Sequence, residues 1–85
     1  MPLVQMPQHV LMQRVQGECL LLNLESGKYF TLDTIGTRML DLAMDETDAE
    51  TCVRQLQQEY DAEAAHIRHD FRELLDNLRT KGLTR

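Results

Sequence analysis

The sequence predicts an α+β domain in which a three-stranded antiparallel sheet is followed by three helices. Two periodicities indicate this order. Up to Leu32, short apolar runs alternate with turn residues, and apolar side chains recur at every second position. After Asp33 they recur at every third or fourth position, as on one face of a helix. Strands followed by helices in one short chain indicate an α+β fold with winged-helix-like proportions.

Three short apolar runs predict the strands. They are HVLMQRV (residues 9–15), ECLLLNLE (residues 18–25) and KYFTL (residues 28–32). Leu20, Leu22 and Leu24 recur at period two, so they share one face of the sheet. The segments QGE and ESG predict turns, and Gly27 suits a short hairpin loop because glycine adopts positive φ angles without strain. The third strand therefore pairs with the second and lies at an edge of the sheet.

Each predicted helix combines an apolar stripe with signals for its start or its end. Asp33 or Thr34 can cap the first helix and Thr47 or Asp48 the second, since short polar side chains accept hydrogen bonds from free N–H groups. The third helix runs from about residue 62 to residue 81 and ends before Gly82. The apolar stripes are, in chain order, Ile35, Met39, Leu42 and Ala43; Ala49, Val53, Leu56 and Tyr60; and Ile67, Phe71, Leu74 and Leu78.

Length and composition indicate a single domain. The chain has 85 residues, of which 42% are hydrophobic and 27% charged, as in soluble globular domains. Residues 1–8 contain both prolines and predict a flexible N-terminal arm, which leaves residues 9–85 as the domain. No apolar run reaches the roughly eighteen residues of a membrane span, and the start lacks a signal-peptide pattern. We therefore expect a cytoplasmic protein without a membrane partner, in which Cys19 and Cys52 are reduced thiols among apolar residues.

No constellation of residues predicts catalysis. His66 and His69, with Asp70 and Glu73 onward, have a spacing that can hold zinc. They project from the polar face of the third helix, however, and we interpret them as solvated residues that pair across one helical turn. Neither cysteine has a context that activates a thiol, the single serine is Ser26 in a turn, and no glycine-rich phosphate loop is present. We expect no enzyme activity, no catalytic residue, no metal and no cofactor.

The charge balance argues against nucleic acid as a partner. Nine Lys and Arg residues face fourteen Asp and Glu residues, which gives a net charge of −5, whereas DNA-binding winged helices concentrate basic residues on the recognition helix. One basic stripe is present, because Arg68, Arg72 and Arg79 lie within about 40° of one another on the third helix, beside Leu75. This stripe is either a solvated flank or one wall of a groove for a peptide with acidic side chains. A small DNA-binding regulator is the alternative from another class.

The third predicted strand, residues 28–32, is the most informative short segment. An edge strand exposes unpaired N–H and C=O groups, which a soluble protein must cover, shorten or use. Lys28 is the only charged residue of this strand, and no proline interrupts it. The edge can therefore accept an added strand from a peptide, unless the N-terminal arm or a second copy of the chain covers it.

Nearly the whole chain, residues 9–84, resembles the PqqD-like peptide-recognition domains, which are also called RiPP recognition elements. The resemblance rests on LLNLESGKYFTL at residues 21–32, Asp33 with Gly36, LQQEY at residues 56–60, Asp70, and the closing KGL at residues 81–83. The order and spacing of these pieces carry the resemblance. Many relatives have Asn in place of Asp33, and both residues can cap a helix.

The resemblance implies a free-standing, non-catalytic chaperone that binds the leader of a ribosomally made precursor peptide as an added strand and delivers it to processing enzymes. The implied enzyme partner is a cysteine protease that removes the leader, as in lasso-peptide biosynthesis. The alternative is a radical SAM enzyme that acts on the pyrroloquinoline quinone precursor, although the hairpin SGKYFTLD is nearer to the lasso type. The implied peptide-binding residues are Lys28, Tyr29, Phe30, Thr31, Leu32, Arg68, Phe71, Arg72, Leu75, Leu78 and Arg79, with Ile67 and Leu74 as further candidates. The sequence leaves open which of Tyr29 and Phe30 faces the groove, since a shift of one residue exchanges the two faces.

Overall fold

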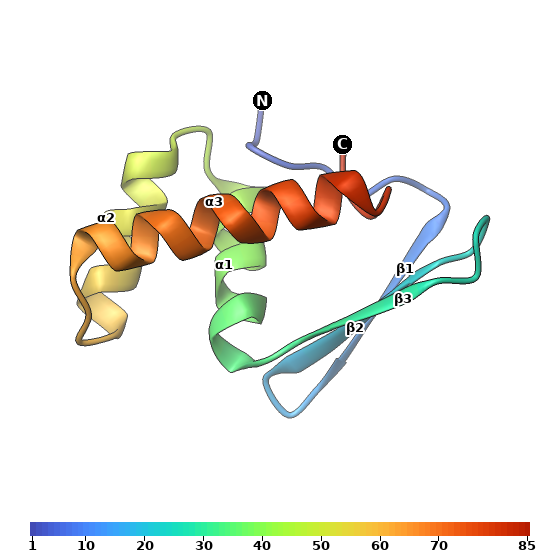
Figure 1. Cartoon of the computed structure of the whole chain (residues 1–85), viewed down its shortest axis with the longest axis horizontal. Coiled ribbons are helices and arrows are strands. Elements are labelled where there is room, and N and C mark those ends of the chain that lie inside the picture. The colour runs from blue at the N-terminus through green and yellow to red at the C-terminus, as the bar shows by residue number, and fades with distance from the viewer.

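Three strands and three helices follow one another along the chain, which confirms the predicted α+β fold class. A computed structural model describes all 85 residues. The elements are β1 (Val10–Val15), β2 (Glu18–Asn23), β3 (Tyr29–Leu32), α1 (Thr34–Asp45), α2 (Ala49–Glu59) and α3 (Ala64–Thr80). The sheet forms one end of the elongated molecule and α2 the other, while α3 runs across α1 toward the sheet (Figure 1).

The sheet has the strand order β1-β2-β3, and both pairs are antiparallel. Gln16 and Gly17 connect β1 to β2 with φ angles of 52° and 84°, the positive values that a two-residue hairpin turn requires. In the second pair Leu21 lies opposite Phe30. β3 has only β2 as a neighbour, so it is the edge strand that the sequence predicts.

Asn23 organises the loop between β2 and β3. Its side-chain Oδ1 accepts hydrogen bonds from the backbone N–H groups of Glu25 at 2.9 Å and Ser26 at 3.1 Å. Its Nδ2 donates to the carbonyl oxygen of Gly82 at 3.5 Å. Gly27 closes the loop with a φ angle of 75°, as predicted. The hairpin is thereby attached to the C-terminal end of α3, and β3 is held at a defined position beside that helix.

Aspartates begin the first two helices. The carboxylate of Asp33 accepts a hydrogen bond from the N–H of Gly36 at 2.8 Å, and that of Asp48 from the N–H of Glu50 at 3.4 Å. One residue of each predicted capping pair is therefore confirmed as the cap. α3 begins two residues later than the predicted residue 62. None of the three helices has the length and apolar character needed to cross a bilayer.

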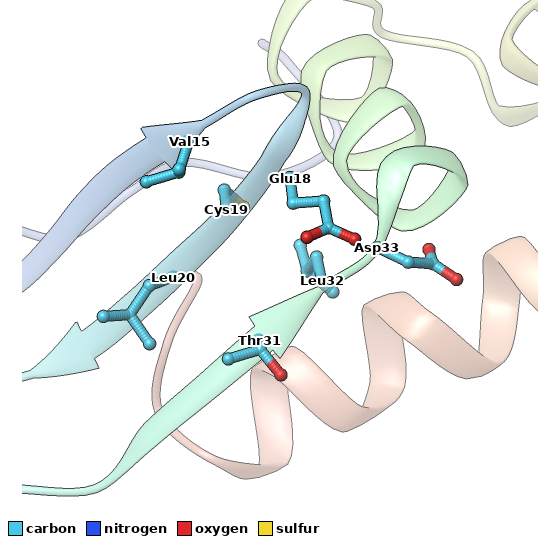
Figure 2. Close-up of a pocket in the computed structure, with 7 residues that line it drawn as sticks. All are labelled: Val15, Glu18, Cys19, Leu20, Thr31, Leu32 and Asp33. Atoms are coloured by element: carbon cyan, nitrogen blue, oxygen red, sulfur yellow. The ribbon is translucent and has the colours of Figure 1, made fainter.

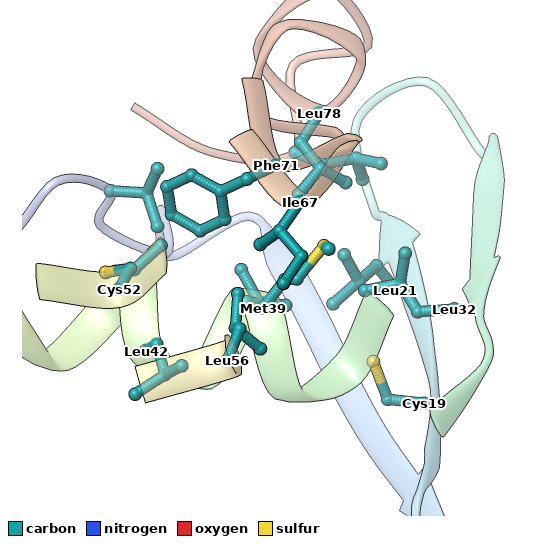
Figure 3. Close-up of a cluster of buried hydrophobic side chains, with 14 of the residues drawn as sticks. Cys19, Leu21, Leu32, Met39, Leu42, Cys52, Leu56, Ile67, Phe71 and Leu78 are labelled. Carbon is teal, nitrogen blue, oxygen red and sulfur yellow. The ribbon is translucent and has the colours of Figure 1, made fainter. Parts of the chain in front are cut away.

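The core fills the space between the inner face of the sheet and the three helices (Figure 3). Its buried side chains are Val4, Val10, Cys19, Leu21, Leu32, Met39, Leu40, Leu42, Ala43, Cys52, Val53, Leu56, Ile67, Phe71, Leu78 and Leu83. Ile35 departs from the sequence prediction, because its side chain is 44% exposed although its spacing places it on the apolar stripe of α1. It lies in the first turn of α1, where the helix borders a groove beside β3.

The two cysteines are buried, unbridged and part of this core, as predicted. Cys19 lies on the inner face of β2 and Cys52 on α2, on different sides of the core (Figure 3). Burial, with the nearby carboxylates of Glu46 and Asp48, raises the pKa of the Cys52 thiol to about 11. This thiol is therefore protonated at neutral pH and is a poor nucleophile.

The N-terminal segment, which the sequence predicts to be a flexible arm, makes contacts that a loose arm would lack. The N–H of Leu3 donates to the carbonyl oxygen of Glu46, just after α1, at 2.9 Å, and that of Val4 to the carbonyl oxygen of Ala43, in the last turn of α1, at 3.1 Å. The N–H of Arg85 donates to the carbonyl oxygen of Gln5 at 2.9 Å. The Val4 side chain is only 1% exposed. The segment thus packs on α1 and the C-terminal residues, and it does not pair with β3.

An ion pair joins α1 to α2 and makes stability depend on pH. Arg38 donates two hydrogen bonds of 2.7 Å to the carboxylate of Glu59, and Gln55 donates a third at 2.9 Å. These bonds lower the pKa of Glu59 from 4.5 to about 2. Because the pKa is lower in the folded state, the stabilisation is complete above pH 4.5 and is lost as the pH falls toward 2.

We expect the free energy of unfolding of the wild type to fall more than that of Glu59→Gln between these pH values. The pair is partly exposed, so the difference should not exceed about 1 kcal/mol. Urea denaturation at a series of pH values measures it. Parallel pH profiles for the two proteins would show that the ion pair contributes nothing to folding.

Candidate functional site

The outer edge of β3 carries unpaired backbone groups. In an antiparallel ladder, alternate residues bond to the partner strand, and the N–H of Asn23 donates to the carbonyl oxygen of Lys28 at 2.8 Å. Because Lys28 bonds to β2, every second residue after it, Phe30 and Leu32, also bonds to β2. The N–H and C=O groups of Tyr29 and Thr31 therefore point away from the sheet. No other segment forms a backbone hydrogen bond with this edge.

The register also answers which aromatic side chain of β3 faces the helices. Phe30 lies opposite the buried Leu21 and is half-buried, whereas Tyr29 lies opposite Leu22 and is 69% exposed. Phe30 thus packs toward α3, and the Lys81 ammonium lies 5.6 Å from the centre of its ring. Tyr29 projects from the outer face of the sheet.

A groove of about 500 Å³ follows β3 on its helical side. α1 contributes the floor of the groove through its first turns, and α3 contributes the opposite wall. The lining residues are Phe30, Thr31, Leu32, Asp33, Ile35, Gly36, Met39, Asp70 and Leu74. Gly36 keeps the start of α1 close to β3, because a Cβ atom there would lie only 3.3 Å from a Leu32 methyl and 3.2 Å from the Asp33 carboxylate. The open edge of β3 borders this groove, where five of the nine lining residues are hydrophobic and two, Asp33 and Asp70, are acidic.

A second hollow, of about 310 Å³, adjoins the groove at the C-terminal end of β3 (Figure 2). It lies beside the β1–β2 turn and is lined by Val15, Glu18, Cys19, Leu20, Thr31, Leu32 and Asp33. Thr31, Leu32 and Asp33 border both spaces. In Figure 2 the side chain of Glu18 reaches from β2 toward the start of α1, where Asp33 lies. The two spaces therefore meet at the C-terminal end of β3.

The structure separates the sequence-predicted site residues into three groups. Phe30, Thr31 and Leu32 line the groove, while Lys28 and Tyr29 lie at its hairpin end. Phe71 and Leu78 are 2% and 0% exposed, so they belong to the core and neither lines the groove beside β3, although Phe71 lies at the base of a hollow between α3 and α2. The remaining four, Arg68, Arg72, Leu75 and Arg79, line another hollow of about 160 Å³ between α3 and α2.

Arg68, Arg72, Leu75 and Arg79 therefore do not lie beside β3, contrary to the expectation from sequence. Arg68 instead donates to the carboxylate of Glu50 on α2, at 2.7 and 3.0 Å, and this pair raises the pKa of the guanidinium. The face of α3 toward β3 carries Asp70 and Leu74. Asp70 is not among the peptide-binding residues predicted from the sequence. It does belong to the PqqD-like pattern, and this membership could have indicated a role at the site.

One of the histidines belongs to a group of possible metal ligands on the exposed side of α3. Ligand atoms of His69, Asp70 and Glu73 lie within 4.8 Å of one another, but all three residues are exposed on one turn of α3 and His66 is not among them. His69 Nε2 lies 3.2 Å from Glu73 Oε2. This geometry is the ordinary consequence of a histidine and a glutamate four residues apart on a helix.

Comparison with known proteins identifies the family of this chain. Residues 18–83 match the family model described as coenzyme PQQ synthesis protein D (PqqD). The chain belongs to the PqqD family. No match was found among curated proteins.

Solved structures share the fold of this PqqD-family chain. One, titled "TbiB1 in Complex with the TbiA(beta) Leader Peptide", is 29% identical, with a TM-score of 0.83 over 94% of this chain and 93% of the other. Another, titled "Lasso peptide synthetase B1 complexed with the leader peptide", is 18% identical, with a TM-score of 0.88 over 98% of each chain. The family resemblance that the sequence indicates is thereby confirmed.

Proposed function

We propose that this PqqD-family domain binds the leader segment of a ribosomally made precursor peptide as a fourth strand on β3, and presents it to a processing enzyme. The observation that carries the proposal is the open edge of β3 beside a groove that offers apolar side chains of β3, α1 and α3. The domain performs no chemistry in this scheme. Its contribution is to hold the peptide extended and within reach of the enzyme.

An added strand would form hydrogen bonds with the N–H and C=O groups of Tyr29 and Thr31. Each such bond contributes about 0.5–1.5 kcal/mol net, so main-chain pairing alone gives weak binding. Alternate side chains of an added strand point to opposite faces. Those on the helical side would meet Phe30, Leu32 and Leu74, and their burial would supply the remaining affinity.

The lasso-peptide pathway is the best-supported context for this activity. The structure at 29% identity is a complex with a leader peptide, and the hairpin of this chain resembles the lasso type. In that pathway the enzyme that receives the leader is a cysteine protease. The second candidate is presentation of the pyrroloquinoline quinone precursor to a radical SAM enzyme, which the description of the matching family model favours.

A fluorescence-anisotropy titration separates these candidates. Its ligands are the TbiA(beta) leader peptide, a pyrroloquinoline quinone precursor, a scrambled leader and a DNA duplex. We expect saturable binding of the lasso-type leader with a Kd in the micromolar range or below, about −8 kcal/mol or better. Binding of the quinone precursor alone would select the other pathway. Binding of DNA alone would replace the proposal with the regulator alternative, although the net charge of −5 opposes it.

Two adjacent leucines of α3 give a matched test of the groove. Leu74 lines the groove beside β3, whereas Leu75 lines the hollow against α2. Both are partly buried, and glutamine preserves their length and helix propensity. We expect Leu74→Gln to weaken leader binding about tenfold, the effect of losing roughly 1.4 kcal/mol of apolar contact, and Leu75→Gln to leave Kd unchanged.

Urea denaturation of both variants controls for the loss of packing against the core. If Leu75→Gln weakens binding while Leu74→Gln does not, the peptide lies between α2 and α3, in the hollow that the arginines line. That outcome would move the site away from β3.

A further inference from the structure

Charged side chains are segregated along the surface that follows β3. Carboxylates gather around the C-terminal end of the strand, where Glu18 and Asp33 border the hollow near the β1–β2 turn and Asp70 borders the groove. Glu73 lies beside Asp70 at a further small hollow on α3. None of the residues that line these three spaces is basic.

The hairpin end of β3 has the opposite character. A space of about 670 Å³ there is lined by Asn23, Ser26, Gly27, Lys28, Tyr29, Thr80 and Lys81. It contains two lysines and no carboxylate. Because the Lys81 ammonium lies 5.6 Å from the centre of the Phe30 ring, this positive charge is held at the rim of the groove rather than far out in solvent.

These charges are mostly not neutralised within the protein. Glu18, Asp70, Lys28 and Lys81 form no ion pair, and Glu73 contacts only His69. By contrast, three arginines elsewhere in the protein, at positions 14, 38 and 68, each form an ion pair with a carboxylate. The carboxylate of Asp33 is partly offset by the N-terminal dipole of α1, which it caps. The remaining charges are available to a ligand.

The two ends are far enough apart to act separately. β3 has four residues, which span roughly 13 Å at the usual rise of a strand. This span exceeds the Debye length of about 8 Å at physiological ionic strength. A peptide charge at one end therefore responds mainly to the charges at that end, because its interaction with those at the other end is largely screened.

We propose that this surface selects a peptide segment of defined charge order, with a basic residue at the acidic end of β3 and an acidic residue at the lysine end. Antiparallel pairing is about two to three times commoner than parallel pairing. An antiparallel peptide has its N-terminal side next to Leu32, so the basic residue precedes the acidic one by about four to six residues. The inference rests on the proposed function and adds the polarity and charge class of the ligand.

A charge scan of a bound leader tests the proposal. Lys and, separately, Glu are placed at each successive position of the TbiA(beta) leader peptide, and Kd is measured for every variant at about 0.15 M salt. We expect Lys to tighten binding, and Glu to weaken it, about two- to fivefold within one N-terminal window. In a second window about four to six residues later, Glu should tighten binding and Lys should weaken it.

Charge reversal in the protein assigns each window to its side chains. Asp70→Lys should reverse the effects of leader Lys and Glu on Kd in the first window only. Lys81→Glu should reverse these effects in the second window only. Asp76→Lys, on the α2 side of α3, and Arg54→Glu, on α2, change the net charge equally and should alter neither window. These variants separate local contacts from a general effect of net charge.

The possible results are distinguishable. If neither the TbiA(beta) leader nor the pyrroloquinoline quinone precursor binds, the proposed function fails and the inference fails with it; if only the quinone precursor binds, the same scan is made on that peptide. If the leader binds but the scan is flat, or if the control variants change it as much as Asp70→Lys, only the charge selection is overturned. If the acidic window precedes the basic one, the antiparallel polarity stated above is wrong.

Discussion

Thr31→Pro is expected to weaken leader binding at least tenfold while leaving the fold intact. The N–H of Thr31 points outward from the edge strand, so its removal breaks no bond within the sheet. Proline is tolerated at such outward positions of edge strands. An added strand, in contrast, would lose a hydrogen-bond donor and would meet the pyrrolidine ring at the centre of the contact. Each tenfold loss corresponds to about 1.4 kcal/mol.

Phe30→Pro and Thr31→Ala are the matched controls. Phe30 bonds to Leu21 of β2, so proline there removes an internal ladder bond and should lower the melting temperature. Thr31→Ala keeps the outward N–H and should bind nearly as the wild type does. Anisotropy titration, thermal melting and circular dichroism together give the result. Wild-type affinity in a folded Thr31→Pro variant would exclude strand addition at β3.

Local patterns in the sequence predict most of the fold, because local interactions determine these features. The change from period two to period three or four falls where β3 ends and α1 begins. Asp33 caps α1, and Gly27 has the positive φ angle that the hairpin requires. The N-terminal segment was harder to predict, since Val4 is buried by contact with residues about forty positions later. A contact between positions so far apart produces no apolar periodicity within a short segment, so the sequence pattern does not reveal it.

The candidate site was predicted on the strand and missed on the helix. An edge strand can be inferred from the order of elements, and the pairing register then places Phe30 inward. Leu74 and Leu75, however, differ by about 100° on α3 and both border its apolar stripe. Which of them faces β3 depends on how α3 crosses α1 and α2, and this is a property of tertiary packing. The same packing turns the arginine stripe toward α2, where Arg68 pairs with Glu50.

The second large effect is expected when Phe71 is replaced, and it concerns the stability of the fold rather than leader binding. Its ring lies in the core on the side of α3 toward α2, and only 2% of the residue is exposed (Figure 3). Phe71→Ala should lower the free energy of unfolding by about 3–5 kcal/mol. A domain of this length has a total stability of only about 4–13 kcal/mol. We therefore expect a variant that is partly unfolded at room temperature, which urea denaturation will show.

Phe71→Leu makes the assignment testable on a folded protein. Leucine keeps much of the apolar volume, so this variant should lose only about 1–2 kcal/mol of stability. Because Phe71 faces the core and not the groove beside β3, its leader affinity should match that of the wild type once the folded fraction is taken into account. A folded Phe71→Leu protein that no longer binds leader would place the peptide against the α2 side of α3. The site would then be the hollow between α2 and α3 that Arg68, Arg72 and Arg79 line, and the groove beside β3 would lose its role.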